Sequence, residues 1–376
     1  MRIAKSKISV CLGIVLIAAL LTNCDALYDK PNKGNDTNVW ESIGKIFDVD
    51  EEGFLNLSGK WKFSIGDDST WASAEYDDGN WEEISVPASW ENEGFHGYNG
   101  YAWYRLSFDL PKELEGKDLN LNLGFVDDID QTYFNGELVG LSGGFPPYFL
   151  TAYNAFRKYY IPKEIIKKGK NLIAVRVYDM MVEGGITKGK IGLYPTKSDS
   201  HLLSELELDL NLTGVWKFKL GDDLNWKQPQ LNDSEWLQIF VPAFWETQGY
   251  SKYNGFAWYR RSFLYPPETH NKKMVLLLGK IDDIDQTFLN GKLVGSIGNW
   301  EFDDVPMNFN HNNEWETIRG YYIPDSLITP GKKMTLAVRV YDGYLDGGIY
   351  EGPIGFVYQE KYHQYWKRRR EIDKSL

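Results

Sequence analysis

The fold is decided by the stretch Thr132-Tyr133-Phe134-Asn135-Gly136-Glu137-Leu138-Val139. Its Asn-Gly pair lies between two short runs rich in apolar and aromatic residues, which is the strongest short-range signal for a two-residue β-hairpin. Asn290-Gly291 stands in the same setting later in the chain. The sequence therefore predicts antiparallel sheets in both halves of the chain.

Further strands are predicted on both sides of the first hairpin. Leu119, Leu121 and Leu123 alternate with asparagines, which is the period of a half-buried strand. The run Asn171–Tyr178 is rich in β-branched residues, whereas Lys163–Lys168 offers one helical turn at most. Strand signals recur every ~8–12 residues without the helices that a parallel sheet needs. We therefore predict an all-β fold of antiparallel sandwiches.

A long internal repeat runs through the chain. Leu55–Phe63 returns 155 residues later as Leu210–Phe218, and the offset holds without a gap as far as the Asp-Asp-Ile-Asp motifs. It has grown to 163 where Arg176–Asp179 meets Arg339–Asp342. A period of this length indicates a duplicated domain rather than a solenoid unit. The sequence thus predicts two tandem sandwiches.

The repeat also sets the expected domain boundaries. We predict repeats at residues 53–195 and 206–360, a polar linker at 196–205, an N-terminal tether at 25–52 and a basic tail at 361–376. The tail holds Lys367-Arg368-Arg369-Arg370, for which a solvated terminal helix is the default and contact with an anionic partner the alternative.

Composition excludes two classes of function. The 376 residues carry 53 acidic and 41 basic side chains, a formal charge of −12. An acidic surface repels phosphate backbones, so nucleic acid is not an expected partner. Only two cysteines and five histidines are present, which excludes a structural zinc cluster of these residues.

The N-terminus predicts export and attachment to a membrane. Arg2, Lys5 and Lys7 precede an uncharged apolar run over residues 8–21, which is too short for an ordinary span and suits a signal peptide. The run ends in Leu21-Thr22-Asn23-Cys24, which resembles the lipobox of bacterial lipoproteins. Lipidation of Cys24 would anchor the protein in the bacterial cell envelope, at the outer membrane or facing the periplasm. The alternative is a secretory signal, residues 1–24, with an incidental cysteine.

Several blocks of the first repeat, in one fixed order, carry a family resemblance. They are Val86–Glu91, Tyr98–Gly100, Ala102–Arg105, Val126–Asp130, Phe134–Gly140 and Asn171–Val177. These blocks resemble the sugar-binding jelly-roll domain of family-2 glycoside hydrolases, of the β-galactosidase type, and are similar to the accessory β domain of sialate O-acetylesterases. The resemblance covers nearly all of both repeats. It implies a galactose-binding-like jelly roll and carbohydrate as the ligand class.

The catalytic parts of both families are expected to be absent. The hydrolases need a catalytic barrel of ~250 residues, and sixteen residues follow Glu360. The esterases need a Gly-Asp-Ser block and an Asp-x-x-His partner. Gly66-Asp67-Asp68-Ser69 comes near the first, but its twin Gly221-Asp222-Asp223-Leu224 lacks the serine and no Asp-x-x-His occurs. A turn is the better interpretation of Ser69, and no catalytic residue is predicted.

A sugar site is predicted where an aromatic plate stands beside polar groups. A sugar ring presents apolar C–H faces to aromatic rings, and its hydroxyls suit carboxylates and amides. The candidates are Trp90, Glu91, Tyr98 and Asn99, with their counterparts Trp245, Glu246, Tyr253 and Asn254. The alternative for each tryptophan is an ordinary place in the core.

Two further ligand-binding candidates follow from the resemblance alone. Asp179 and Asp342 begin stretches that match a galactosidase loop whose aspartate reaches the sugar. The alternative is that the glycine pair in each stretch, Gly184-Gly185 in the first, only shapes the loop.

The acidic triplet Asp127, Asp128 and Asp130 recurs as Asp282, Asp283 and Asp285. On one continuous strand, Asp128 and Asp130 would share a face. Three hypotheses stay open: internal ion pairs with the recurring arginines at 105, 157 and 176, contacts to sugar hydroxyls, and a Ca2+ site of hard oxygen ligands. No cofactor is otherwise predicted.

The inserts between hairpin and arginine differ most between the repeats. Residues 141–156 and 296–318 are rich in aromatic side chains, which suits either divergent binding loops or packing over a sandwich edge.

Three functions are consistent with the sequence. The first is a non-catalytic, lipid-anchored carbohydrate-binding protein that assists glycan capture or degradation. The others are an interaction scaffold of an envelope complex and a hydrolase of the β-galactosidase type.

Overall fold

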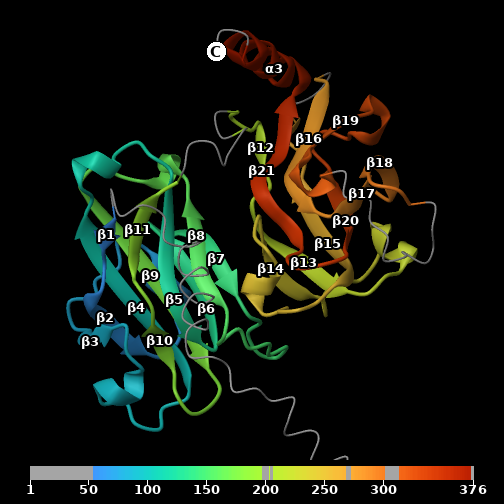
Figure 1. Ribbon diagram of the computed structural model, residues 1–376. Coiled ribbons are helices and arrows are strands. Elements are labelled where there is room, and N and C mark those ends of the chain that lie inside the picture. Colours follow the sequence, from blue (N-terminus) through green and yellow to red (C-terminus); the bar gives the residue numbers. More distant parts are fainter. Residues whose placement is uncertain (1–53, 197–202, 204–205, 268–271, 301–312, 374–376) are drawn as a thin grey trace, which may run out of the picture. The chain divides into compact units, whose positions relative to one another are not determined.

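Antiparallel strands dominate the computed structural model, which describes residues 54–196, 203, 206–267, 272–300 and 313–373. Every strand pairing of the described residues is antiparallel. The all-β prediction is confirmed, and Figure 1 follows the strands from blue to red.

The first half forms one sandwich of two sheets, here called the first sandwich. Its larger sheet has the order β3 (Glu82–Val86), β2 (Gly59–Ile65), β4 (Gly100–Asp109), β9 (Lys170–Asp179), β6 (Ile129–Phe134) and β7 (Glu137–Ser142). Its smaller sheet has the order β1 (Leu55–Asn56), β11 (Gly192–Pro195), β5 (Leu119–Asp127) and β10 (Gly185–Lys188), with β8 (Phe156–Ile161) also paired to β5.

The second half repeats this plan in the second sandwich. The larger sheet has the order β14 (Leu237–Val241), β13 (Gly214–Leu220), β15 (Gly255–Leu264), β20 (Lys333–Asp342), β17 (Ile284–Leu289) and β18 (Lys292–Ile297). The smaller sheet has the order β12 (Leu210–Asn211), β21 (Gly348–Tyr358), β16 (Met274–Asp282) and β19 (Ile318–Ile323).

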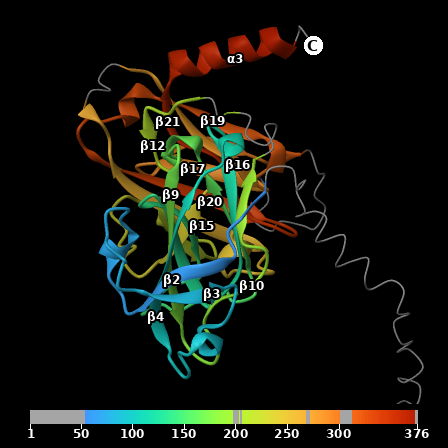
Figure 2. The same cartoon turned by 90° about the vertical axis from the view of Figure 1, so that its left-hand side faces the viewer.

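Helices are few and short among the described residues. The α-helix α3 spans Gln359–Asp373 and continues from β21, as Figures 1 and 2 show. The 3-10 helices span Ser69–Ala72, Trp90–Glu93, Lys112–Leu114, Lys163–Ile165, Leu224–Lys227, Glu246–Gln248, Glu314–Glu316 and Asp325–Leu327.

The core of the first sandwich lies between its two sheets. Leu119, Leu121 and Leu123 of β5 are fully buried and pack with Trp61 and Val175 of the facing sheet. The alternation predicted for β5 is therefore confirmed on its inner face. An equivalent core fills the second sandwich, so each half buries its own apolar faces.

The hairpin turn forms as predicted. Asn135 and Gly136 both have positive φ (51° and 91°), the requirement of a type I′ turn, and Phe134 pairs with Glu137 across it. The Asn135 side chain is anchored, because its Oδ1 accepts from the Leu172 backbone N–H (2.9 Å). Asn290 and Gly291 do the same between β17 and β18.

Residues of the predicted tail and of the predicted linker are buried in one apolar cluster. The terminal helix begins two residues earlier than predicted and is not wholly solvated, since Tyr365 is buried against Val275 and Val357. Leu203, inside the predicted linker, is buried in the same cluster. Leu203 and Tyr365 are large apolar side chains. They cover the outer face of the smaller sheet of the second sandwich. Phe54–Leu376 forms one compact unit, so the predicted domain boundaries stay predictions.

The N-terminal predictions fall on residues outside the described ones. The signal peptide, the tether and the lipidation of Cys24 therefore stay predictions. Within the described part of the chain, no helix has the length and apolar character needed to cross a membrane.

Candidate functional site

The predicted aromatic plate lies inside the core. Trp90 has no exposed surface, packs with Phe63, and donates from its indole N–H to the Tyr98 carbonyl (3.2 Å). Trp245 is equally buried beside Phe218. A ring without an exposed face cannot stack on a sugar, so the platform role is wrong for both tryptophans. The alternative of a core role is the one that the structure supports.

The glycine pair after β9 shapes the backbone around this tryptophan. A Cβ on Gly184 would lie 2.1 Å from Trp90 Cζ2, and one on Gly347 would lie 2.1 Å from Trp245 Cζ2. Only glycine lets the loop backbone approach these rings so closely. The structure thus supports the alternative in which the glycines form the loop.

The other candidates of the first sandwich surround Trp90. Glu91 is half-buried and its Oε2 accepts from the Gly184 backbone N–H (3.1 Å), which ties the 3-10 helix Trp90–Glu93 to the loop after β9. Tyr98 donates from its hydroxyl to the Tyr101 carbonyl (2.6 Å). Asn99 is exposed, whereas Asp179 is fully buried. These residues are neighbours, yet most of their polar atoms already serve the fold.

The second sandwich places the corresponding residues alike. Glu246 Oε2 accepts from the Gly347 backbone N–H (2.9 Å), and the Tyr253 hydroxyl donates to the Phe256 carbonyl (2.7 Å). Asp342 is fully buried. Asn254, with its amide oriented so that nitrogen faces the carboxylate, donates to Asp342 Oδ2 (3.0 Å).

The acidic triplet does not lie on one strand. The chain leaves β5 at Asp127 in one sheet and enters β6 at Ile129 in the other, so Asp128 and Asp130 point to different surroundings. The prediction that they share a face is wrong for this reason. Asp130 turns inward and Asp128 stays at the sandwich end.

The inward carboxylate forms the predicted internal ion pair. Asp130 accepts from Arg157 Nε (2.8 Å), from the Thr132 hydroxyl (2.8 Å) and from the Tyr159 hydroxyl (2.8 Å), and both partners of the ion pair are fully buried. Asp285 and Arg319 repeat the pair at 2.9 Å. These contacts confirm the ion-pair hypothesis for one member of each triplet.

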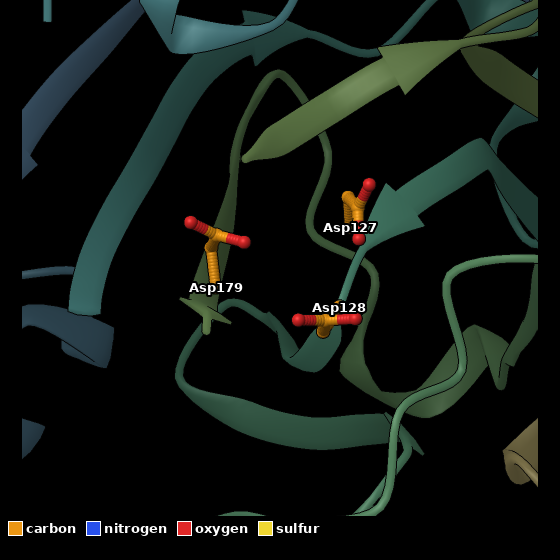
Figure 3. Close-up of side chains that lie close together, drawn as sticks. All are labelled: Asp127, Asp128 and Asp179. Atoms are coloured by element: carbon orange, nitrogen blue, oxygen red, sulfur yellow. The ribbon is translucent and has the colours of Figure 1, made fainter. Parts of the chain in front are cut away.

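The remaining two carboxylates meet Asp179 at the end of the first sandwich. Ligand oxygens of Asp127, Asp128 and Asp179 all lie within 4.8 Å of one another. Figure 3 shows the three carboxylates converging from the end of β5, the β5–β6 junction and the end of β9. Asp282, Asp283 and Asp342 form the same cluster in the second sandwich.

Crowding changes the acidity of these clusters. Burial and the nearby Asp128 charge raise the pKa of Asp127 to about 7, and burial with the Asp128 and Glu91 charges raises the pKa of Asp179 to about 6. In the second sandwich, burial and the Asp283 charge raise the pKa of Asp282 to about 9. Such carboxyls favour the protonated state or a bound cation.

A different polar site lies on the outer face of the larger sheet. Arg176 donates from Nε to Asp67 Oδ1 (2.6 Å) and from Nη1 to Gln131 Oε1 (3.0 Å). Its guanidinium also lies over the rings of Tyr101 and Phe145, 4.6 and 4.3 Å from their centroids. The two rings are nearly parallel, so the cation sits against a stack of aromatics that reaches the surface.

A pocket of about 450 Å³ opens beside this guanidinium. We call it the Arg176 pocket, and its lining is Asp67, Asp68, Ser69, Trp103, Gln131, Tyr133 and Arg176. Its size falls in the ~300–1,000 Å³ range of small-molecule sites. The lining combines carboxylate, amide, hydroxyl and guanidinium groups with the half-buried ring of Tyr133, which stacks on the fully buried Trp103.

The second sandwich has a less polar version of these residues. Arg339 again donates to Asp222 (Nε to Oδ1, 2.7 Å) and to Gln286 (3.0 Å). Leu224 and Phe288, however, stand at the positions of Ser69 and Tyr133. The two surfaces are therefore built alike but offer different hydrogen-bonding groups.

Ser69 occupies a turn. It begins the 3-10 helix Ser69–Ala72, whose N-cap Asp68 accepts from the Thr70 backbone N–H (2.9 Å). This geometry supports the turn interpretation over a nucleophile.

Part of this chain is similar in sequence to glycosidases. No family model matches the chain. A 135-residue segment is 30% identical to a putative beta-glucuronidase of Formosa agariphila, and covers 32% of this chain but only 12% of that protein. A 47-residue segment is 47% identical to a beta-galactosidase of Vibrio vulnificus, covering 11% of this chain and 5% of that protein. The chain thus matches a small fraction of the length of these relatives.

Solved glycosidases align over most of the chain at low similarity. A beta-glucuronidase of Bacteroides uniformis aligns with 78% of this chain and 28% of its own, at 17% identity and a TM-score of 0.32. A family-2 glycosyl hydrolase of Bacteroides cellulosilyticus aligns with 78% and 32%, at 15% identity and a TM-score of 0.33. The predicted likeness to glycoside hydrolases is confirmed at the level of sequence segments, and the likeness to the esterases stays a prediction.

Sequence reasoning missed the Arg176 pocket. The sequence predicts Arg176 only as a partner in ion pairs, and Gln131 and Tyr133 only as residues of a hairpin strand. One signal was available, since Gln131 and Tyr133 project to the same face of their strand and recur in the second repeat as Gln286 and Phe288.

Proposed function

We propose that this chain is a non-catalytic carbohydrate-binding protein, held at the bacterial envelope by a lipid on Cys24, with its sugar site in the Arg176 pocket. The observation that carries the proposal is the lining of that pocket. Sugar hydroxyls need donors and acceptors in fixed positions, and the C–H faces of the ring pack on aromatic side chains. The pocket supplies the polar groups, and the half-buried ring of Tyr133 supplies the aromatic surface.

The charges of the pocket favour a neutral sugar. Asp67 and Arg176 neutralise each other in a paired contact, with side chains that are 33% and 19% exposed. Asp68 adds an exposed carboxylate at the rim. Two carboxylates and one guanidinium leave a net charge of −1 at the pocket, so an acidic sugar would meet net repulsion. We therefore propose hydroxyl-rich neutral glycans as the ligand class.

The similarity to a beta-glucuronidase and a beta-galactosidase supports carbohydrate as the ligand. Capture of a glycan at the cell surface is the role that fits an anchored binding module. The envelope location rests on the sequence Leu21-Thr22-Asn23-Cys24.

A glycan array tests the proposal directly. The purified protein should bind neutral glycans, and Gln131→Ala should weaken binding while the matched change Gln286→Ala in the second sandwich should not. The same preparation should leave aryl glycosides intact. Hydrolysis of an aryl glycoside would instead favour the enzyme, and absence of glycan binding with capture of an envelope protein would favour the scaffold.

A further inference from the structure

We propose that Asp127, Asp128 and Asp179 bind one divalent cation of the Ca2+ type in the first sandwich, and that the matching cluster of the second sandwich does not. This site is separate from the Arg176 pocket. Successive residues of a strand face opposite sides, so Asp179 lies on the inner face of β9, three residues beyond the outward-facing Arg176. The cation site rests on different residues from the sugar site, so a test of one proposal does not decide the other.

The geometry of the oxygens suits a calcium ion. Ca2+ binds carboxylate oxygens at about 2.4 Å, so two of its ligands lie at most about 4.8 Å apart. The ligand oxygens of Asp127, Asp128 and Asp179 meet that limit for every pair. They come from two adjoining residues and from the end of β9, and they face one space in Figure 3.

A second observation points to a ligand. Asp179 is fully buried, and its Oδ1 accepts from the Met181 backbone N–H (3.1 Å). Its Oδ2 is buried as well and has no hydrogen-bond partner among the described residues. A buried carboxylate oxygen without a donor carries a large desolvation cost, which a cation beside it would offset.

Asp128 keeps lone pairs for a cation, because each of its oxygens accepts only one hydrogen bond from a backbone N–H or hydroxyl of the described residues. Asp128 accepts from the Met180 backbone N–H at Oδ2 (3.1 Å) and from the Thr151 hydroxyl at Oδ1. These bonds hold the carboxylate in place without supplying a positive charge.

Among its described residues, the second sandwich lacks a counterpart of the unpartnered Asp179 Oδ2. There the Asn254 amide lies against Asp342 Oδ2, and in the orientation that satisfies both of its ends its nitrogen donates to that oxygen (3.0 Å). The oxygen equivalent to Asp179 Oδ2 then has a partner. Asn99 stands at the corresponding sequence position of the first sandwich, yet no described donor reaches Asp179 Oδ2. With that donor in place, Asp342 Oδ2 does not carry the desolvation cost that a cation offsets at Asp179 Oδ2. One ion per chain follows.

Calorimetric titration of the chelator-treated, dialysed protein with CaCl2 tests the site. The wild-type protein should take up one Ca2+ per chain. Asp179→Asn and Asp127→Asn should each weaken uptake by about tenfold or more, because ligand charge sets affinity in such sites. The matched variant Asp342→Asn should titrate like the wild type.

Thermal melts with and without Ca2+ guard against a folding artefact. Ca2+ should raise the melting temperature of the wild type and of Asp342→Asn, and should leave that of Asp179→Asn unchanged. The proposal is wrong if the wild-type protein takes up no Ca2+ or two ions. It is also wrong if Asp179→Asn and Asp127→Asn bind Ca2+ like the wild type, or if Asp342→Asn loses uptake. Glycan binding is scored separately.

Discussion

The buried pair of Arg157 and Asp130 predicts a large loss of stability from a single substitution. Both side chains are fully buried, with Nε and Oδ1 2.8 Å apart. The guanidinium also donates to the carbonyls of Asp128 (3.0 Å), Ala152 and Ala155 (2.7 Å). Arg157→Met removes the cation and four donated bonds and leaves the Asp130 charge without its partner.

The cost follows from breaking a buried pair by removing one partner. Such a change costs about 3–5 kcal/mol of the free energy of unfolding. In a compact unit of this size, with an unfolding entropy of about 2.1 cal/mol/K per residue, that lowers the melting temperature by roughly 4–7 °C. Arg319→Met, which breaks the equivalent pair of the second sandwich, should cost a similar amount.

Urea unfolding and thermal melts measure the effect. Lys62→Met is the matched control, because Lys62 pairs with Glu83 at 3.1 Å on the surface, and an exposed pair contributes about 1 kcal/mol or less. The double variant Arg157→Met/Asp130→Leu should recover much of the loss, since no charge stays buried. An Arg157→Met protein as stable as Lys62→Met would refute the reasoning.

Three further changes have distinct outcomes. Gly184→Ala should lower stability by about 1–3 kcal/mol in urea, because its Cβ would lie 2.1 Å from Trp90 Cζ2. Burial raises the pKa of Glu246 to about 8 from its ordinary 4.5, so its contribution to stability is present below that ordinary value and is lost as pH rises toward about 8. Melts of Glu246→Gln across that window should show a flatter pH dependence than the wild type. Cys24→Ala should move the protein from the membrane fraction to the soluble fraction with no change in melting temperature, and continued membrane partitioning would contradict the anchor.

Local chemistry explains what the sequence predicted well. Asn135 and Gly136 specify their turn by themselves, because few other residue pairs accept two positive φ angles. The alternation of Leu119, Leu121 and Leu123 likewise identifies the inner face of β5. The internal repeat predicted the second sandwich from the first, since each strand signal occurs twice.

The sites that the sequence could not predict depend on contacts between residues far apart in the chain. Asp67 and Arg176 are 109 residues apart, and no local pattern shows that they share a pocket. The chain crosses from one sheet to the other at Asp128. The crossing separates Asp130 from Asp127 and Asp128, which lie beside Asp179 instead. The sequence alone cannot place Trp90, because tryptophan suits both a core and a sugar platform, and the fold buries its ring completely.

The affinity of the Arg176 pocket for a neutral glycan tests the central claim most directly. Asp68→Asn removes a rim carboxylate but keeps the N-cap of the 3-10 helix, because asparagine caps as well as aspartate. Hydrogen bonds to a charged group contribute about 1.5–3 kcal/mol, so isothermal titration with the captured glycan should show roughly tenfold or greater weakening. The matched variant Asp223→Asn, at the same cap in the second sandwich, should bind like the wild type. Equal affinities for Asp68→Asn and the wild type, with both proteins folded, would contradict the assignment of the sugar site to this pocket.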